Sequence, residues 1–144
     1  TQTSDPAIWA IGDVTNHPNA LLGGRFRLES VQNAISQGQT AAKAILGRAT
    51  AYAEVPWFWS DQYDLKLQTA GIRHASDQEV VRGDPATRKF SVCYLRDGAL
   101  AAIDTIANLK DFMPAKKLIA EKRPIDPARL ANPDIPLAEA GRTG

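Results

Sequence analysis

The spacing of apolar residues near the start of the chain predicts a strand followed by a loop. A short apolar run, Ile8-Trp9-Ala10-Ile11, ends in Gly12-Asp13. This pattern is typical of a buried parallel strand whose carboxyl end opens into a loop. Residues 15–28, which contain Asn, Pro and Gly, predict an irregular connection. A single strand cannot form a sheet, so we expect its partner strands to come from elsewhere in the protein.

A helix is predicted between Ser30 and Gly47. Ser30 is a favourable N-cap residue, and Gly47 suits the position just after a last helical turn. Between them, apolar side chains recur with a period close to 3.6 residues; they are Val31, Ala34, Ile35, Ala41, Ala42, Ile45 and Leu46. Strand, loop and helix together resemble the last piece of a Rossmann-like α/β nucleotide-binding domain.

The pattern changes after Pro56, where a second region begins. Asp97-Gly98, a hairpin signal, lies between two of the segments in this region that are typical of strands. These segments are residues 64–72, 78–82, 88–95 and 99–106. We expect the strands in meander order within a small α+β domain.

Helices are predicted to follow the strands. Asn108 is placed to cap a helix that runs to about Lys122, and Pro114 favours a later start or a kink. A short helix over residues 127–131 and a tail complete the chain. The fold class is therefore α/β plus α+β, in three parts: residues 1–49, the connector 50–56, and residues 57–144.

Composition and charge narrow the classes of partner. The 17 basic and 16 acidic residues leave a net charge of +1, so no long-range field favours nucleic acid or a membrane surface. No segment approaches the roughly 20 apolar residues of a membrane span.

Cys93 lies in an apolar alternation and is expected to be a buried small hydrophobe, compatible with a reducing cytoplasm. The chain begins with Thr1 and not with Met, and we expect it to be part of a longer protein.

Gly12-Asp13 and the helix start at Ser30 are candidates for a ligand site. A carboxylate at the end of a buried strand can accept hydrogen bonds from ribose or ribityl hydroxyls. Free N–H groups and the positive dipole end at the start of a helix can stabilise negative charge on a ligand. The alternatives are a loop or capping aspartate and an ordinary amphipathic helix.

Three aromatic residues, Trp57-Phe58-Trp59, follow Pro56 in a chain with only 7% aromatics. If the segment is extended, Trp57 and Trp59 face one side and Phe58 the other. Indoles can pack on a planar cofactor or anchor a partner surface, and the alternative is core at a domain junction.

His17 and His74, the only histidines, are expected at the surface, since nothing around them has the spacing of a metal site. The sequence shows no combination of nucleophile, base and orienting group that would indicate a catalytic site, so no catalytic side chain is predicted.

These segments, in this order, resemble the FAD-dependent ferredoxin reductases of bacterial oxygenase and cytochrome P450 systems, the family of putidaredoxin reductase and rhodocoxin reductase. The matching stretches are residues 8–14, 27–34, 37–38 and 55–63. The last, with Pro56-Trp57-Phe58-Trp59-Ser60-Asp61-Gln62, is the most family-specific. The resemblance covers nearly all of residues 5–136.

The resemblance implies roles for individual residues. It implies that Asp13 binds the FAD ribityl chain and that the backbone N–H of Val31 meets the flavin pyrimidine edge, with Gly12 and Ser30 beside them. Trp59 would pack close to the isoalloxazine. Trp57 would lie nearer the surface where a ferredoxin docks, and the domain from Trp57 onward would form part of that surface or of a homodimer interface.

The implied reaction is electron transfer from NADH, or less often NADPH, through FAD to a two-iron two-sulfur ferredoxin. The chain has no Gly-x-Gly-x-x-Gly motif for FAD or NADH, so activity is expected of a longer parent enzyme and not of this chain alone. Two alternatives stay open: a docking or dimerisation module without flavin, and a relative that reduces rubredoxin or forms part of a nitrite reductase.

Overall fold

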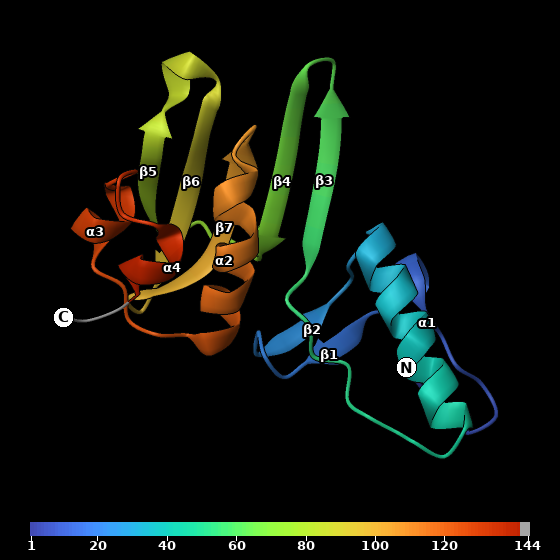
Figure 1. The fold of residues 1–144 in the computed structure, drawn as a ribbon. Coiled ribbons are helices and arrows are strands. Elements are labelled where there is room, and N and C mark those ends of the chain that lie inside the picture. Colours follow the sequence, from blue (N-terminus) through green and yellow to red (C-terminus); the bar gives the residue numbers. More distant parts are fainter. Residues whose placement is uncertain (142–144) are drawn as a thin grey trace. The chain divides into compact units, whose positions relative to one another are not determined.

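The computed structural model describes residues 1–141, and the chain divides into two compact units (Figure 1). The first unit is Thr1–Phe58, and the second begins at Trp59. Each unit is built around its own contacts and is described separately below.

The first unit begins without the predicted parallel strand. Ile8 and Ile11 are exposed, and the segment forms only an isolated antiparallel bridge between Gln2 and Trp9. The prediction of a buried strand here is wrong for residues 1–58, because a parallel strand needs neighbours for its backbone groups and this unit supplies none. A short 3-10 helix, η1 (Gly12–Val14), follows instead.

An antiparallel hairpin occupies the segment predicted as irregular. Strand β1 (His17–Asn19) pairs with β2 (Gly24–Phe26), and Asn19 lies opposite Gly24. The side chain of Asn19 fixes the turn, since its Oδ1 accepts hydrogen bonds from the N–H groups of Leu21 and Leu22.

Helix α1 (Val31–Ile45) begins and ends as predicted. The hydroxyl of Ser30 accepts a hydrogen bond from the N–H of Asn33, and Gly47 adopts a φ of +74°. Its inner face differs from the prediction, because it consists mainly of amide side chains: Gln32, Asn33, Gln37 and Ala41 are buried. Most of the predicted apolar stripe is exposed among residues 1–141, namely Val31, Ile35, Ile45 and Leu46.

The second unit is built on a five-stranded sheet in the order β3-β4-β7-β6-β5. The strands are β3 (Trp57–Gln62), β4 (Leu65–Gly71), β5 (Gln78–Asp84), β6 (Lys89–Arg96) and β7 (Ala99–Ile106). The predicted strand positions are confirmed, but the meander order is wrong, because β4 pairs with β7 and not with β5.

Gly71 explains how β4 can end so close to β7. Its φ is +79°, and a Cβ at this position would lie 2.1 Å from the carbonyl oxygen of Ala101. Only a residue without a side chain allows this approach. The chain then crosses over residues 72–77 to β5, so the β6–β7 hairpin lies between β4 and β5 in the sheet.

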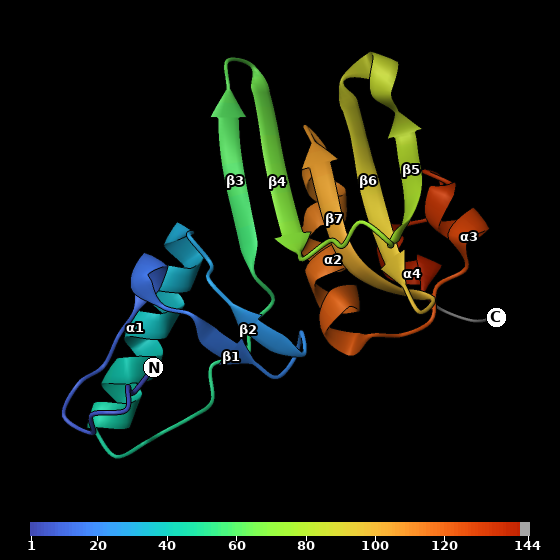
Figure 2. The same cartoon turned by 180° about the vertical axis from the view of Figure 1, so that it is seen from behind.

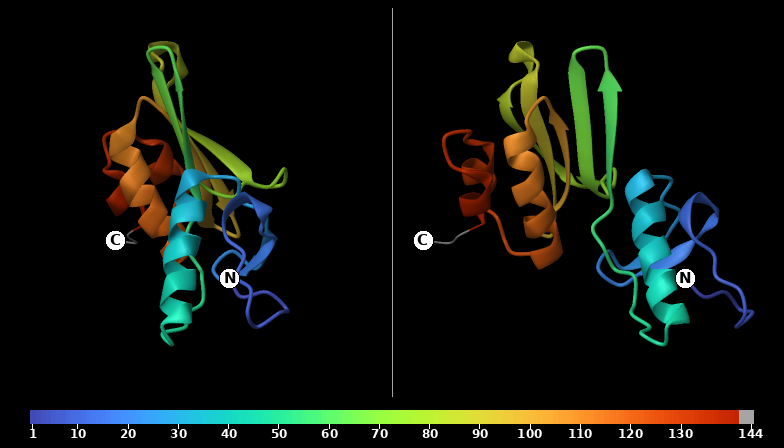
Figure 3. Two further views of the ribbon diagram at one scale, coloured as in Figure 1. Left: turned by 90° about the vertical axis from the view of Figure 1, so that its right-hand side faces the viewer. Right: turned by 45° about the vertical axis from the view of Figure 1, so that its right-hand side comes forward.

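Three helices cover one face of this sheet: α2 (Leu109–Glu121), α3 (Pro127–Ala131) and α4 (Leu137–Ala140) (Figures 2 and 3). The core lies between them and the sheet, where Cys93, Ile103, Ala115 and Leu130 have no exposed surface. The predicted helices 108–122 and 127–131 are confirmed, whereas α4 lies in the segment predicted as a tail.

Asn108 precedes α2 as expected, but its side chain does not cap the helix. Its Nδ2 instead donates hydrogen bonds to Ser91 and Asp111. Across residues 1–141, no helix combines the length and apolar character that a membrane crossing requires.

Candidate functional site

Gly12 has a tightly constrained backbone position in the candidate site of the first unit. Its φ of +75° is one that residues with a side chain rarely adopt, and a Cβ here would lie 3.4 Å from the Cβ of Ala34 on α1. Its N–H donates a 2.8 Å hydrogen bond to Oε1 of Gln37. Its carbonyl accepts hydrogen bonds from both the N–H and the hydroxyl of Thr15. The η1 turn is therefore held against the N-terminal half of α1.

Asp13 lies on the exposed side of this turn. Arg27 donates to its main-chain carbonyl at 3.3 Å, which helps to hold the backbone in place. Its carboxylate has no hydrogen-bond or ion-pair partner within residues 1–141, so its oxygens are available to accept hydrogen bonds from hydroxyl groups.

The start of α1 supplies hydrogen-bond donors beside that carboxylate-bearing turn. The hydroxyl of Ser30 is used by Asn33, and the side chain of Asn33 donates to the carbonyl of Leu28 at 2.8 Å, which fixes the entry into the helix. The N–H groups of Val31 and Gln32 have no partner in the helix, because its first turn leaves them free. With the positive end of the helix dipole, they can bind a carbonyl or anionic edge.

The two candidate tryptophans lie on β3. Trp57 is half-buried and belongs to the first unit, whereas Trp59 is 36% exposed and is the first residue of the second unit. The segment is extended, which is the condition under which Trp57 and Trp59 were expected to face the same side of the strand. The structure thus brings η1 and the start of α1 together in the first unit and places both indoles on a single strand.

His17 corrects a prediction made from the sequence. It is only 8% exposed, not a surface residue, and its ring meets the ring of Tyr52 edge-on at 5.1 Å. Burial lowers the pKa of His17 below 6.5, with smaller contributions from the amino group of Thr1 and from Arg25. Sequence reasoning missed this residue, since nothing in a polar loop signals that β1 turns it inward.

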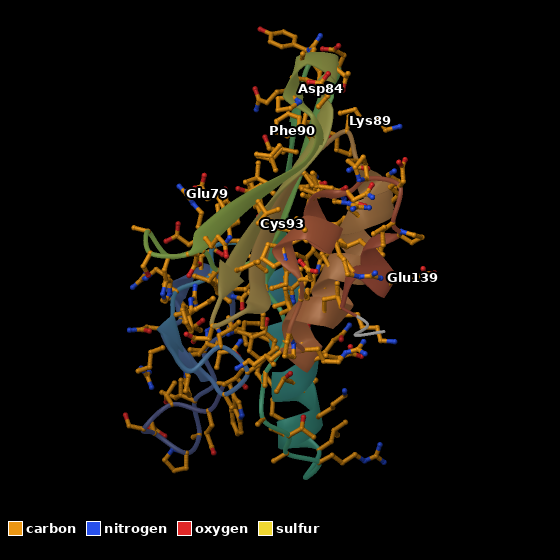
Figure 4. The ribbon with its side chains drawn as sticks, turned by 90° about the vertical axis from the view of Figure 1, so that its left-hand side faces the viewer. Glu79, Asp84, Lys89, Phe90, Cys93 and Glu139 are labelled. Carbon is orange, nitrogen blue, oxygen red and sulfur yellow. The ribbon has the colours of Figure 1, made fainter. Side chains whose placement is uncertain are left out.

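Cys93 is buried as predicted. It lies midway along β6, which begins at Lys89, and the neighbouring strand β5 ends at Asp84 (Figure 4). Burial, with a smaller contribution from Asp111, raises the pKa of the Cys93 thiol to about 12, which keeps it protonated and unreactive at neutral pH. Within the described part of the chain, no group of three or more His, Cys, Asp or Glu side chains could hold a metal ion.

Taken together, the exposed groups of the first unit suit binding: one carboxylate acceptor, main-chain donors at a helix start, and a rigid glycine turn between them. This is the kind of donor and acceptor set that meets a ligand carrying both hydroxyls and a carbonyl edge.

Comparison with known proteins defines the class. Residues 57–141 match the family model described as reductase C-terminal, which covers more than half of the chain. The chain therefore belongs to the reductase C-terminal family, and the resemblance drawn from its sequence is confirmed.

Three relatives make the class more specific. The chain is 50% identical over 138 residues to the 5,5'-dehydrodivanillate O-demethylase ferredoxin reductase subunit of Sphingobium sp. (strain NBRC 103272 / SYK-6), covering 95% of this chain and 34% of that protein. It matches the ferredoxin reductase for the CYP199A2 system from Rhodopseudomonas palustris with a TM-score of 0.89, at 37% identity, over 96% of this chain and 34% of that one.

The third relative is solved with its partner. The covalent putidaredoxin reductase–putidaredoxin complex matches with a TM-score of 0.89, at 37% identity, over 96% of this chain and 33% of that chain. The chain thus spans about a third of the length of the curated relatives it matches, and those relatives are oxidoreductases.

Proposed function

We propose that this chain forms the C-terminal third of an FAD-dependent ferredoxin reductase. The observation that carries the proposal is the 50% identity, along 95% of the chain, to the ferredoxin reductase subunit of a demethylase. The match runs through both units, so it includes the η1 turn and the start of α1 as well as the reductase C-terminal domain.

The chemistry of the first unit fits FAD. Asp13 would accept hydrogen bonds from the ribityl hydroxyls, with Gly12 holding the turn that presents it. The N–H of Val31, at the helix start that Ser30 caps, would donate to the carbonyl edge of the flavin pyrimidine. When bound, the flavin supplies the hydride-accepting and single-electron chemistry. The helix start favours negative charge on the edge that it meets, and so favours the reduced flavin.

The two tryptophans take different parts in the proposal. Trp59 would pack beside the isoalloxazine, where an indole face excludes water from the flavin. Trp57 would lie nearer the surface that receives the carrier protein. No side chain of residues 1–144 is assigned as an acid, base or nucleophile.

In the complete enzyme, Asp13 and Val31 would help to hold the FAD through which electrons from NADH would reach a two-iron two-sulfur ferredoxin that serves an oxygenase or a cytochrome P450. The solved complex of a relative with putidaredoxin supports a ferredoxin as the partner. We place the enzyme in the cytoplasm, where a free thiol such as Cys93 is maintained, and propose a homodimer as its assembly.

The test is to purify the complete protein that contains residues 1–144 and record its flavin absorbance. The proposal expects a yellow protein that oxidises NADH and reduces a two-iron two-sulfur ferredoxin. A colourless protein without NADH oxidation would instead support a docking or dimerisation module. A yellow protein that prefers rubredoxin, or that donates to a nitrite reductase, would keep the flavin assignment and overturn the ferredoxin partner.

A further inference from the structure

The amide of Gln37 links Gly12 to His17 in a buried chain of hydrogen bonds. Its Oε1 lies 2.8 Å from the N–H of Gly12 and 3.1 Å from the hydroxyl of Thr15, while its Nε2 lies 2.9 Å from Nδ1 of His17. A backbone N–H can only donate, so the amide atom facing Gly12 must be the oxygen. The amide nitrogen must then face His17.

This orientation fixes the tautomer of His17. An amide nitrogen carries only donors, so Nδ1 of His17 must accept the hydrogen bond and cannot carry a proton. The proton of the neutral ring therefore lies on Nε2. That nitrogen is buried and has no hydrogen-bond partner among the residues that the structure describes.

A protonated ring would not fit this arrangement. Protonation adds an N–H at Nδ1, which would point at the donor group of Gln37, and a buried charge without a partner is costly. Among residues 1–141, the groups that face the ring add no compensating negative charge. The N-terminal segment contributes the amino group of Thr1, β2 contributes Arg25, α1 contributes the neutral Gln37, and the connector contributes the ring of Tyr52.

The nearest carboxylate on the connector is already committed to other groups. Oε2 of Glu54 accepts hydrogen bonds from Gln32 at 2.8 Å and from Ser36 at 2.9 Å. Burial and the two positive groups lower the pKa of His17, which agrees with a ring held neutral.

We propose that His17 and Gln37 are positioning residues that hold the Gly12–Asp13 turn in its flavin-binding form only while His17 is neutral. The part of this inference that concerns flavin rests on the proposed function; the part that concerns the turn does not. Neither residue contacts flavin in this account. They act through the N–H of Gly12, whose backbone carries Asp13.

The direction of the pH effect follows from the geometry. The folded-state pKa lies below the ordinary 6.5, so the unfolded or released turn binds the proton more tightly than the closed turn does. The turn is fully held above pH 6.5 and is released as the pH falls below 6.5 toward the lowered pKa. Flavin affinity should then fall by up to about tenfold per pH unit in that range.

The first experiment needs no flavin. With 15N-labelled histidine, residues 1–144 give two pairs of ring-nitrogen signals, one pair for each of the two histidines in the chain. At pH 7.5 the pair from His17 should show an unprotonated Nδ1 and a protonated Nε2, and it should titrate below 6.5. His74, which is exposed, is the internal reference. A proton on Nδ1, or a mixture of tautomers, would overturn the inference.

The second experiment measures flavin retention by the complete reductase between pH 7.5 and 5.5. His17→Asn keeps a neutral acceptor at the place of Nδ1, so its flavin affinity should stay constant down to pH 5.5, where the affinity of the wild type has fallen. His74→Asn should behave as the wild type. If His17→Asn releases flavin with the wild-type pH dependence, the positioning role fails.

Gln37→Glu separates positioning from simple packing. A carboxylate at this position still accepts from Gly12, but it replaces the donor that faces His17 with an acceptor. The pKa of His17 should then rise above 6.5, and flavin should be retained more tightly at pH 5.5 than at pH 7.5. An unchanged histidine titration in this variant would contradict the inference. A wild-type enzyme that never binds FAD would overturn the proposed function, while the histidine spectrum would still decide the state of the turn.

Discussion

The guanidinium of Arg82 and the carboxylate of Asp111 form an ion pair in the core of the second unit, with Nε 3.0 Å from Oδ2 and side-chain exposures of only 2% and 3%. Asp111 also accepts hydrogen bonds from Ser91 and Asn108. Arg82 further donates to the carbonyls of Leu130, Asn132 and Ile135. The pair therefore joins β5 to α2, to α3 and to the segment that follows α3.

Breaking this pair should destabilise the second unit severely. Arg82→Met leaves a buried carboxylate without its charge partner and three carbonyls without their donor, so it should lower the free energy of unfolding by about 3–5 kcal/mol. Urea denaturation followed by circular dichroism measures it. Arg88→Met is the matched control, since Arg88 and Asp64 are also 3.0 Å apart but 58% and 72% exposed. The control should cost less than about 1 kcal/mol. Equal losses in both variants would contradict this account.

Residues 1–144 alone should bind FAD weakly or not at all. The first unit offers one turn and one helix start, and no glycine-rich phosphate motif occurs in the sequence. Titration of the chain with FAD, followed by flavin fluorescence, checks this. Micromolar binding, worth about 8 kcal/mol, would show that far more of the site lies in these residues than we propose.

Asp13→Ala in the complete reductase should weaken FAD binding by about 1.5–3 kcal/mol, because it removes a charged acceptor while leaving the backbone of η1 unchanged. Equilibrium dialysis of the flavin gives the difference directly. Asp134→Ala, which removes an exposed carboxylate in the other unit, is the control and should have no effect. Wild-type affinity in Asp13→Ala would remove Asp13 from the site.

Trp57→Ala and Trp59→Ala should produce different defects. Truncation of an interface anchor costs about 2 kcal/mol or more, so Trp57→Ala should raise the KM for ferredoxin while NADH-driven reduction of ferricyanide stays nearly unchanged. Trp59→Ala should instead change the flavin absorbance or the rate of flavin reduction by NADH. Steady-state assays with both acceptors, and a melting curve for each variant, distinguish these outcomes.

If the tryptophans only fill the core, both variants lose stability and neither has a selective kinetic defect. Equal slowing of both acceptors by Trp57→Ala would exclude the docking role.

Cys93 should react with a thiol reagent only after unfolding. Its side chain has no exposed surface, and burial raises its pKa to about 12, so neither access nor the thiolate is available in the folded chain. Reaction with Ellman's reagent at pH 8, with and without urea, measures this. Rapid modification of the native chain would mean that the sheet opens on the timescale of the assay.

Local patterns in the sequence were enough to place the elements of the second unit. Alternation located β4 to β7, and the residues around Asn108 and Pro127 located α2 and α3. Pairing depends on distant residues, so the partnership of β4 with β7 was not predictable from the spacing that located each strand. The short helix α4 was also not predicted from the sequence, because its four residues are too few to show a helical period.

The first unit shows the opposite limit. The apolar run at Ile8-Trp9-Ala10-Ile11 was expected to be buried between strands that residues 1–58 do not contain, and it is not a strand in the structure. The cap at Ser30 was predictable because it depends on residues three apart. The inward position of His17 was not, because it depends on Gln37 and Tyr52, which lie 20 and 35 positions further along the chain.

The tight crossing at Gly71 has a consequence for the tryptophan-bearing strand. β3 is joined to the rest of the sheet only through β4, and β4 can reach β7 only because position 71 lacks a side chain. In Gly71→Ala the added methyl group would clash with the carbonyl oxygen of Ala101 on β7. The end of β4 would then move away from β7, which would detach the β3–β4 hairpin at that end and leave the pairing of β5, β6 and β7 intact. Hydrogen exchange of the β3 and β4 amides would reveal that selective loosening. In this way Gly71, which lies on β4, governs how firmly the strand that carries both indoles is held in the sheet.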